Sequence, residues 1–144
     1  MADRITLADY YYTMVPDKPG EGARVLGALR DAGVNLLAFS AFPHARRAQV
    51  DLVPSDPAAF LAAARAARIK LSRRKSVFLI DGEDRVGALA EVMTKLGAAK
   101  INVTATDAVC TGGGWGGGGR YGALLWVKSR DVKRAAQALG VTAS

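Results

Sequence analysis

Apolar and polar positions along the chain follow two periods, which predict short strands separated by helices. Residues 6–15 alternate imperfectly and include three consecutive tyrosines, which indicates a strand. Asp17, Pro19 and Gly20 then break the pattern and signal a helix start near the proline. The following apolar residues recur at helical spacing, and Gly33 provides a left-handed stop; these residues are Val25, Leu26, Leu29 and Ala32.

The remaining segments complete two similar series of elements. In the first half we expect strands at 34–42 and 48–53, a capped helix at 58–67 and a short strand at 69–71. The second half predicts strands at 76–80, 101–109, 121–128 and a short one at 141–143, a turn at 82–85, and helices at 86–99 and 131–139. Each half is therefore a βαββα(β) unit of the ferredoxin-like kind, an α+β fold with antiparallel sheets and helices on one face.

An internal repeat underlies this symmetry. Asp17 and Asp84, Gly20 and Gly87, and Asn35 and Asn102 are each 67 positions apart, and no gap is needed across twenty positions. Val53 matches Val127 at an offset of 74, which places seven extra residues within 112–122. The period is too long for a solenoid repeat and suits two small domains. We expect one domain at residues 1–73 and a second at 74–144.

The repeated motifs resemble those of the ACT domain. They are an Asp-x-Pro-Gly turn at 17–20 and Gly-Val-Asn-Leu at 33–36, with variant copies at 84–89 and 100–103. ACT domains typically pair through strands and helices, and many bind an amino acid between two domains to regulate metabolic enzymes. The resemblance covers nearly the whole chain and implies a stand-alone tandem ACT protein that forms a homodimer.

Two departures from the ACT pattern lie in the second copy. Val86 replaces the proline of the turn, and Lys100 stands where Gly33 stands in the first copy. Because a left-handed lysine costs roughly 1 kcal/mol relative to glycine, we expect the second helix to end differently. We therefore expect the first copy to be the main binding site.

The turn and helix start have the chemistry to bind an amino acid. Free amide groups and the helix dipole there attract a carboxylate, and glycines allow close approach to the backbone. Asn35, Asp17 or Glu21 could take the ammonium group. The resemblance implies ligand-binding positions at Asp17, Lys18, Pro19, Gly20, Glu21, Asn35 and Leu36, with counterparts Asp84, Arg85, Gly87 and Asn102. Purely structural roles, such as a helix cap at Asp17, are the alternative at each position.

A glycine-rich segment at 112–122 surrounds Trp115. It lacks the spacing of a phosphate-binding loop and joins two predicted strands rather than a strand and a helix. One hypothesis makes Trp115 a lid over a ligand or an arm on a neighbouring subunit. A long flexible hairpin loop without further function is the alternative.

Composition argues against several kinds of function. One cysteine, Cys110, and one histidine, His44, allow no intrachain disulfide, no cysteine-based zinc site and no nucleophile–base pair. We therefore predict no enzymatic activity, no cofactor and no metal. The chain shows no leader and no apolar run long enough for a membrane span, so we expect a soluble cytoplasmic protein.

The net charge of +7 includes six basic residues within eleven positions: Arg65, Arg68, Lys70, Arg73, Arg74 and Lys75. This cluster could bind an anion or nucleic acid, but no aromatic residues interleave with it, and a solvated helix face is the simpler interpretation.

Three functional hypotheses remain. The leading one is an allosteric regulatory protein that senses an amino acid and modulates a partner enzyme or regulator. The second is a dimerisation or docking module that binds no ligand, and the third, which we favour least, is nucleic-acid binding through the basic cluster.

Overall fold

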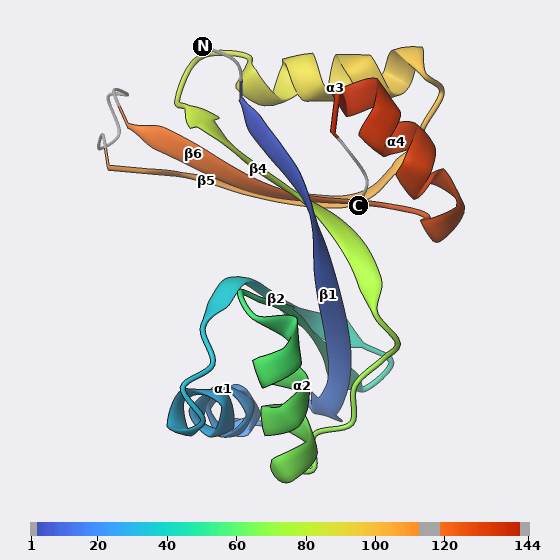
Figure 1. Cartoon of the computed structure of the whole chain (residues 1–144). Helices are drawn as coiled ribbons and strands as arrows, with labels where there is room; N and C mark the ends of the chain where they lie inside the picture. The colour runs from blue at the N-terminus through green and yellow to red at the C-terminus, as the bar shows by residue number, and fades with distance from the viewer. Residues whose placement is uncertain (1–2, 113–118, 142–144) are drawn as a thin grey trace. The chain divides into compact units, whose positions relative to one another are not determined.

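The computed structural model describes residues 3–112 and 119–141 of the chain. These residues divide into two compact units. The first-half unit is Asp9–Lys75, and the second-half unit combines Met1–Ala8 with Ser76–Ser144. Figure 1 shows both units, with most of their helices and strands labelled. The division into domains at residues 1–73 and 74–144 stays a prediction.

The described residues form six strands and four α-helices. The strands are β1 (Arg4–Pro16), β2 (Leu36–His44), β3 (Arg47–Pro54), β4 (Lys75–Glu83), β5 (Val103–Thr111) and β6 (Arg120–Val127). The helices are α1 (Glu21–Asp31), α2 (Pro57–Ala66), α3 (Ala88–Ala98) and α4 (Val132–Leu139), the last preceded by a 3-10 turn, η2 (Ser129–Asp131). This is the predicted α+β class.

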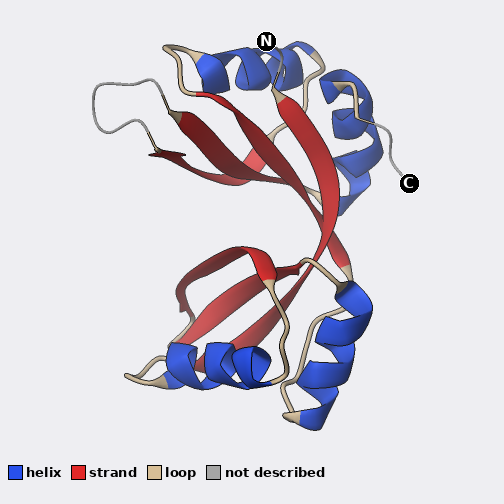
Figure 2. Ribbon diagram, turned by 60° about the vertical axis from the view of Figure 1, so that its left-hand side comes forward, coloured by secondary structure: helices blue, strands red, loops and turns tan. Residues whose placement is uncertain are grey.

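Hydrogen bonding orders the strands β2-β3-β1-β4-β6-β5, and the ladders β1–β3, β2–β3, β4–β6 and β5–β6 are antiparallel. Strand β1 begins in the second-half unit and continues into the first-half unit. Within each unit the two helices lie on one side of the strands (Figure 2).

Each unit has its own apolar core between strands and helices. In the first-half unit, Val25 and Leu29 of α1 and Phe60 of α2 pack against Val50 and Leu52 of β3. The corresponding core of the second-half unit joins residues of β4 and β6, together with Ile101 just before β5, to both helices. Its members are Phe78, Ile80, Ala88, Val92, Leu96, Ile101, Tyr121, Ala123, Leu125, Val127, Ala135, Ala136 and Leu139. Burial of each Val, Leu, Ile or Phe side chain among these contributes about 1.5–3 kcal/mol, and burial of apolar side chains is the main stabilising term.

Several helix boundaries differ from the prediction. Helix α1 begins at Glu21 after Gly20, so Pro19 lies outside the helix and Asp17 is not its cap. Helix α3 begins at Ala88 rather than Val86, because Gly87 takes the left-handed capping conformation. The start of α2 is as expected: the Asp56 carboxylate accepts a hydrogen bond from the Ala59 N–H at 3.2 Å.

The predicted inner face of α1 is only partly correct. Val25 and Leu29 are buried, whereas Leu26 and Ala32 are exposed. In α3, Val92 and Leu96 are buried as expected, and Leu89 and Met93 are half-buried. The apolar stripe that contacts each sheet is therefore narrower than the sequence pattern indicates.

The predicted strand at residues 69–71 is wrong. Helix α2 ends at Ala66, Arg68 beyond it is left-handed, and the Ile69 N–H donates a hydrogen bond back to the Ala64 carbonyl. Ser72 then donates its N–H to the Tyr12 carbonyl at 2.8 Å, while its hydroxyl oxygen accepts from the Tyr12 N–H at 3.0 Å. Because a side chain replaces the backbone acceptor, no ladder forms here. Of the predicted closing strand at 141–143, only Val141 lies within the described residues, and it is not in a strand.

Candidate functional site

A cavity of about 300 Å³ lies in the second-half unit, beside the loop between β4 and α3. The loop and the first turn of α3 form one side, and β5 with one residue of β6 forms the other. The lining residues are Asp84, Arg85, Gly87, Ala88, Leu89, Ala90, Ala108, Val109, Cys110 and Tyr121. Three of the predicted site residues, Asp84, Arg85 and Gly87, therefore share this cavity.

The N-terminus of α3 borders the cavity. Gly87 caps the helix with φ 81°, and no side chain caps it. The first helical bond closes from the Glu91 N–H to the Gly87 carbonyl at 3.2 Å, so the N–H groups of Leu89 and Ala90 precede the hydrogen-bonded part of the helix. Such groups, together with the helix dipole, favour an anion.

Asp84 places a carboxylate beside Cys110 of β5. The hydrogen bond between them raises the pKa of the Cys110 thiol, and burial and the negative charge of Asp84 act in the same direction. The thiol is therefore protonated at neutral pH and is a poor nucleophile. Asp84 is the anionic group that the cavity offers to a cation.

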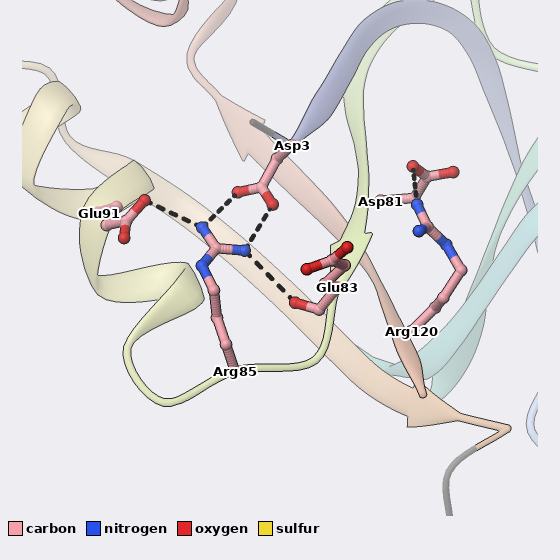
Figure 3. A network of polar contacts seen from close by, with 6 residues as sticks. All are labelled: Asp3, Asp81, Glu83, Arg85, Glu91 and Arg120. Atoms are coloured by element: carbon pink, nitrogen blue, oxygen red, sulfur yellow. Dashed lines mark hydrogen bonds and ion pairs between the residues drawn. The ribbon is translucent and has the colours of Figure 1, made fainter. Parts of the chain in front are cut away.

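Arg85 is held by its own neighbours (Figure 3). Its guanidinium donates to both oxygens of Asp3 at 2.8 and 3.3 Å and to Glu91 at 2.9 Å. A further bond of 3.3 Å reaches the Glu83 carbonyl. These bonds, chiefly the one to Asp3, raise the pKa of Arg85. The cation of this loop is thus paired with carboxylates of the protein rather than presented to a ligand.

Tyr121 contributes a buried hydroxyl group. Only 5% of the residue is exposed, and within the described part of the chain the hydroxyl makes no hydrogen bond of ordinary geometry. Burial first, and then the neighbouring Asp3 carboxylate, raise the pKa of Tyr121 to about 12. The phenol therefore remains a neutral donor at physiological pH.

The loop before α1, residues 17–20, ends in a left-handed glycine like the loop before α3, but its charged side chains pair differently. Gly20 caps α1 with φ 91°, again without a side-chain cap. Glu21 is engaged by Arg24 at 2.9 Å and by Lys18 at 3.9 Å. Asn35 is exposed, and its backbone carbonyl accepts from the N–H and the hydroxyl of Ser55 at 3.0 and 3.1 Å. Leu36 is half-buried at the start of β2.

Other predicted positions lie apart from the cavity. Asn102 is exposed just before β5 and does not line it. Trp115 lies outside the described residues. Among the described residues, no group of three or more His, Cys, Asp or Glu side chains could hold a metal ion.

Sequence reasoning missed the strand side of the cavity. Cys110 and Tyr121 lie directly opposite each other in the β5–β6 ladder, so both face the same side of the sheet. Asp3 was also missed, because a contact between positions 82 apart leaves no local pattern. Alternation along β5 could have placed Ala108 and Cys110 on one face, but only the ladder register shows that this face meets the loop.

Comparison with solved structures identifies the fold. Protein BT0572 from Bacteroides thetaiotaomicron has a TM-score of 0.77 at 18% identity, with 94% of this chain and 88% of that chain covered. The regulatory subunit of aspartate kinase from Thermus thermophilus gives 0.61 at 15% identity, covering 97% and 95%. The alpha and beta subunits of an aspartokinase give 0.59 at 17% identity, covering 96% and 95%. The sequence matches no protein-family model and no curated protein.

These similarities establish the fold alone: the chain has an ACT-like fold, shared with regulatory subunits of aspartate kinase. No helix among the described residues has the length and apolar character needed to cross a membrane.

Proposed function

We propose that this protein is a regulatory module that binds an amino acid and thereby modulates a partner enzyme or regulator. The cavity beside α3 carries the proposal, because it pairs an uncapped helix N-terminus with the carboxylate of Asp84. An amino acid carries one anionic and one cationic group close together, and this site offers a complementary partner to each.

In this proposal the ligand carboxylate accepts hydrogen bonds from the Leu89 and Ala90 N–H groups. The ammonium group pairs with Asp84, and the ligand side chain lies toward Ala108 and Val109 of β5. A volume of about 300 Å³ accommodates a single amino acid. Regulatory subunits of aspartate kinase with the same fold support a regulatory role rather than a catalytic one.

We further propose that the chain is a tandem repeat with another site in the first half, the copy that the sequence pattern favours as the main site; we place the first site in the second half because the cavity lies there. The two loops agree at the predicted offset: Gly20 and Gly87 are both left-handed and both precede helices of eleven residues. The start of the next strand repeats as well, because the register shifts at Leu36/Ala38 in β2 and at Val103/Ala105 in β5. The second site would use Asp17 and Gly20 with Asn35 and Leu36.

A homodimer belongs to the same proposal. Strands β2 and β5 stand at the two ends of the strand order and pair on one side only. Exposed apolar residues lie on both, namely Leu37, Phe39, Phe42 and Val109. Such strands favour association with another chain. A docking module without a ligand therefore remains the second candidate.

Thermal unfolding with each of the twenty amino acids at millimolar concentration tests the ligand-binding function. A ligand at 100 times its dissociation constant adds about 2.7 kcal/mol, which raises the midpoint by roughly 5–10 °C for a chain of this size. Asp84→Asn should remove the ligand-induced rise of the unfolding midpoint. Asp17→Asn is the corresponding substitution in the first half and serves as the matched control. An unfolding midpoint that none of the twenty amino acids changes would favour the docking module.

A further inference from the structure

The polar network around Arg85 connects the candidate site to the beginning of the chain. Asp3, just before β1, receives two hydrogen bonds from Arg85, although 82 positions separate the two residues. The Asp3 side chain is 7% exposed and that of Arg85 30% exposed. In Figure 3 the Arg85 guanidinium lies between Asp3 and Glu91. This ion pair is therefore a half-buried contact with two hydrogen bonds rather than a fully exposed surface pair.

The Asp3 carboxylate fits beside β4 because residue 82 is a glycine. A Cβ added to Gly82 of β4 would collide with the Asp3 carboxylate and would come within 3.0 Å of the Tyr121 ring. Gly82 and Tyr121 are direct partners in the β4–β6 ladder. The carboxylate thus occupies space above the ladder that any other residue at position 82 would fill.

Arg85 in turn contacts both ends of the loop that lines the cavity. It bonds to the Glu83 carbonyl at the end of β4 and to Glu91 in the first turn of α3. Asp84 and Gly87, which flank it in the loop, both line the cavity. Holding the Arg85 guanidinium in place therefore fixes where the Asp84 carboxylate and the start of α3 lie.

We propose that Asp3 is a positioning residue of the candidate site, which acts through Arg85 to hold the loop 84–87 in its cavity-lining shape. Asp3 itself does not touch the ligand. Because linkage is reciprocal, a ligand that binds this loop shape also strengthens the Asp3–Arg85 contact and so stabilises the start of β1. The part of the inference that concerns a ligand rests on the proposed function.

The single cysteine gives a readout that needs no ligand. Asp84, and not Asp3, is the charged group that acts on the Cys110 thiol, so the pH dependence of alkylation reports where Asp84 lies. Tyr121, the direct partner of Cys110 in the ladder, stays neutral below about pH 12. The experiment measures alkylation of Cys110 by iodoacetamide against pH, followed by mass spectrometry, on the full chain.

Asp3→Asn should release the loop, move Asp84 away from the thiol and lower the pH midpoint of alkylation. The rate at pH 8 should then rise by about two-fold or more, since the thiolate fraction rises. Asp81→Asn is the matched control. Figure 3 shows Asp81 in the same region, where its ion pairs are with Arg4 and Arg120 and not with a residue of the loop. Its alkylation profile should equal that of the unmodified protein.

An unchanged midpoint in Asp3→Asn, with or without a loss of stability, would overturn the proposal. Should that variant not fold, Glu91→Gln replaces it, because the Glu91 side chain is 63% exposed and anchors the same guanidinium. A smaller shift in the same direction is expected there, and no shift would count against the proposal. Failure of all amino acids to bind would refute the proposed function alone, since the thiol assay contains no ligand.

Discussion

Lys100 follows helix α3 in the same left-handed conformation in which Gly33 follows helix α1, with φ 58° and 72°. Both residues donate their N–H to the carbonyl three positions back, and the next residue donates to the carbonyl five positions back. This is the Schellman arrangement, in which glycine is the favoured residue. The expectation that the second helix would end differently is therefore wrong: the packing of Ile101 into the core holds Lys100 in place.

Replacing Lys100 with glycine should stabilise the protein by about 1 kcal/mol, because glycine adopts this conformation without steric cost. The converse change, Gly33→Lys, should destabilise it by a similar amount. Urea unfolding of both variants checks the pair. Equal midpoints for Lys100→Gly and the unmodified protein would show that the left-handed lysine is not strained.

Gly82→Ala should destabilise the protein by about 1–3 kcal/mol, since the added methyl group displaces Asp3 or the Tyr121 ring. Gly122→Ala is the matched control, because its added Cβ would meet only the Ile80 carbonyl oxygen at 3.9 Å. The unfolding midpoints in urea distinguish the two. Introduced into an Asp3→Ala variant, Gly82→Ala should reduce the free energy of unfolding by less than it does in the unmodified chain.

Asp51→Asn should raise stability at neutral pH. Asp51 is 4% exposed, and burial raises the pKa of its carboxyl above the ordinary value despite the Gln49 hydrogen bond and the charge of Lys75. A folded pKa above the unfolded one means that stability is complete at acidic pH and is lost as pH rises through the folded pKa. The gain from Asp51→Asn should therefore disappear near pH 3, as unfolding curves at several pH values would reveal.

Asp3→Asn should have the opposite pH dependence. The hydrogen bond from Arg85 lowers the pKa of the Asp3 carboxyl, so its stabilising effect is present above the unfolded pKa of about 3.8. The effect is lost as pH falls through the folded pKa. The variant should be less stable than the unmodified protein at pH 7 and equally stable at strongly acidic pH. A constant difference at all pH values would contradict the assignment.

The local elements could be predicted because they depend on local patterns. Strand alternation, the glycine stop at Gly33 and the Asp56 cap give β1, the C-terminal end of α1 and the start of α2. The strand predicted at 69–71 failed because Ile69 and Leu71 alternate like a strand but follow a Schellman turn, and the Ser72 side chain takes the place of a ladder bond. A propensity pattern does not distinguish core packing from pairing.

The candidate site was predictable only on its helix side. Asp84, Arg85 and Gly87 were named from the repeated turn, whereas Tyr121 and Cys110 join them through the register of β5 with β6. The pairing of Arg85 with Asp3 depends on β1 lying next to β4 in the strand order. Contacts of this kind are set by topology, which a single sequence does not reveal.

The most direct test of the central claim is a backbone amide NMR titration of the ¹⁵N-labelled protein with the twenty amino acids. The proposal predicts that at least one amino acid shifts the Leu89 and Ala90 amide signals, together with those of Asp84 and Cys110. Corresponding shifts around Gly20 and Asn35 would indicate the second site. Unchanged spectra with all twenty amino acids at 10 mM, or shifts confined to regions away from both loops, would contradict it.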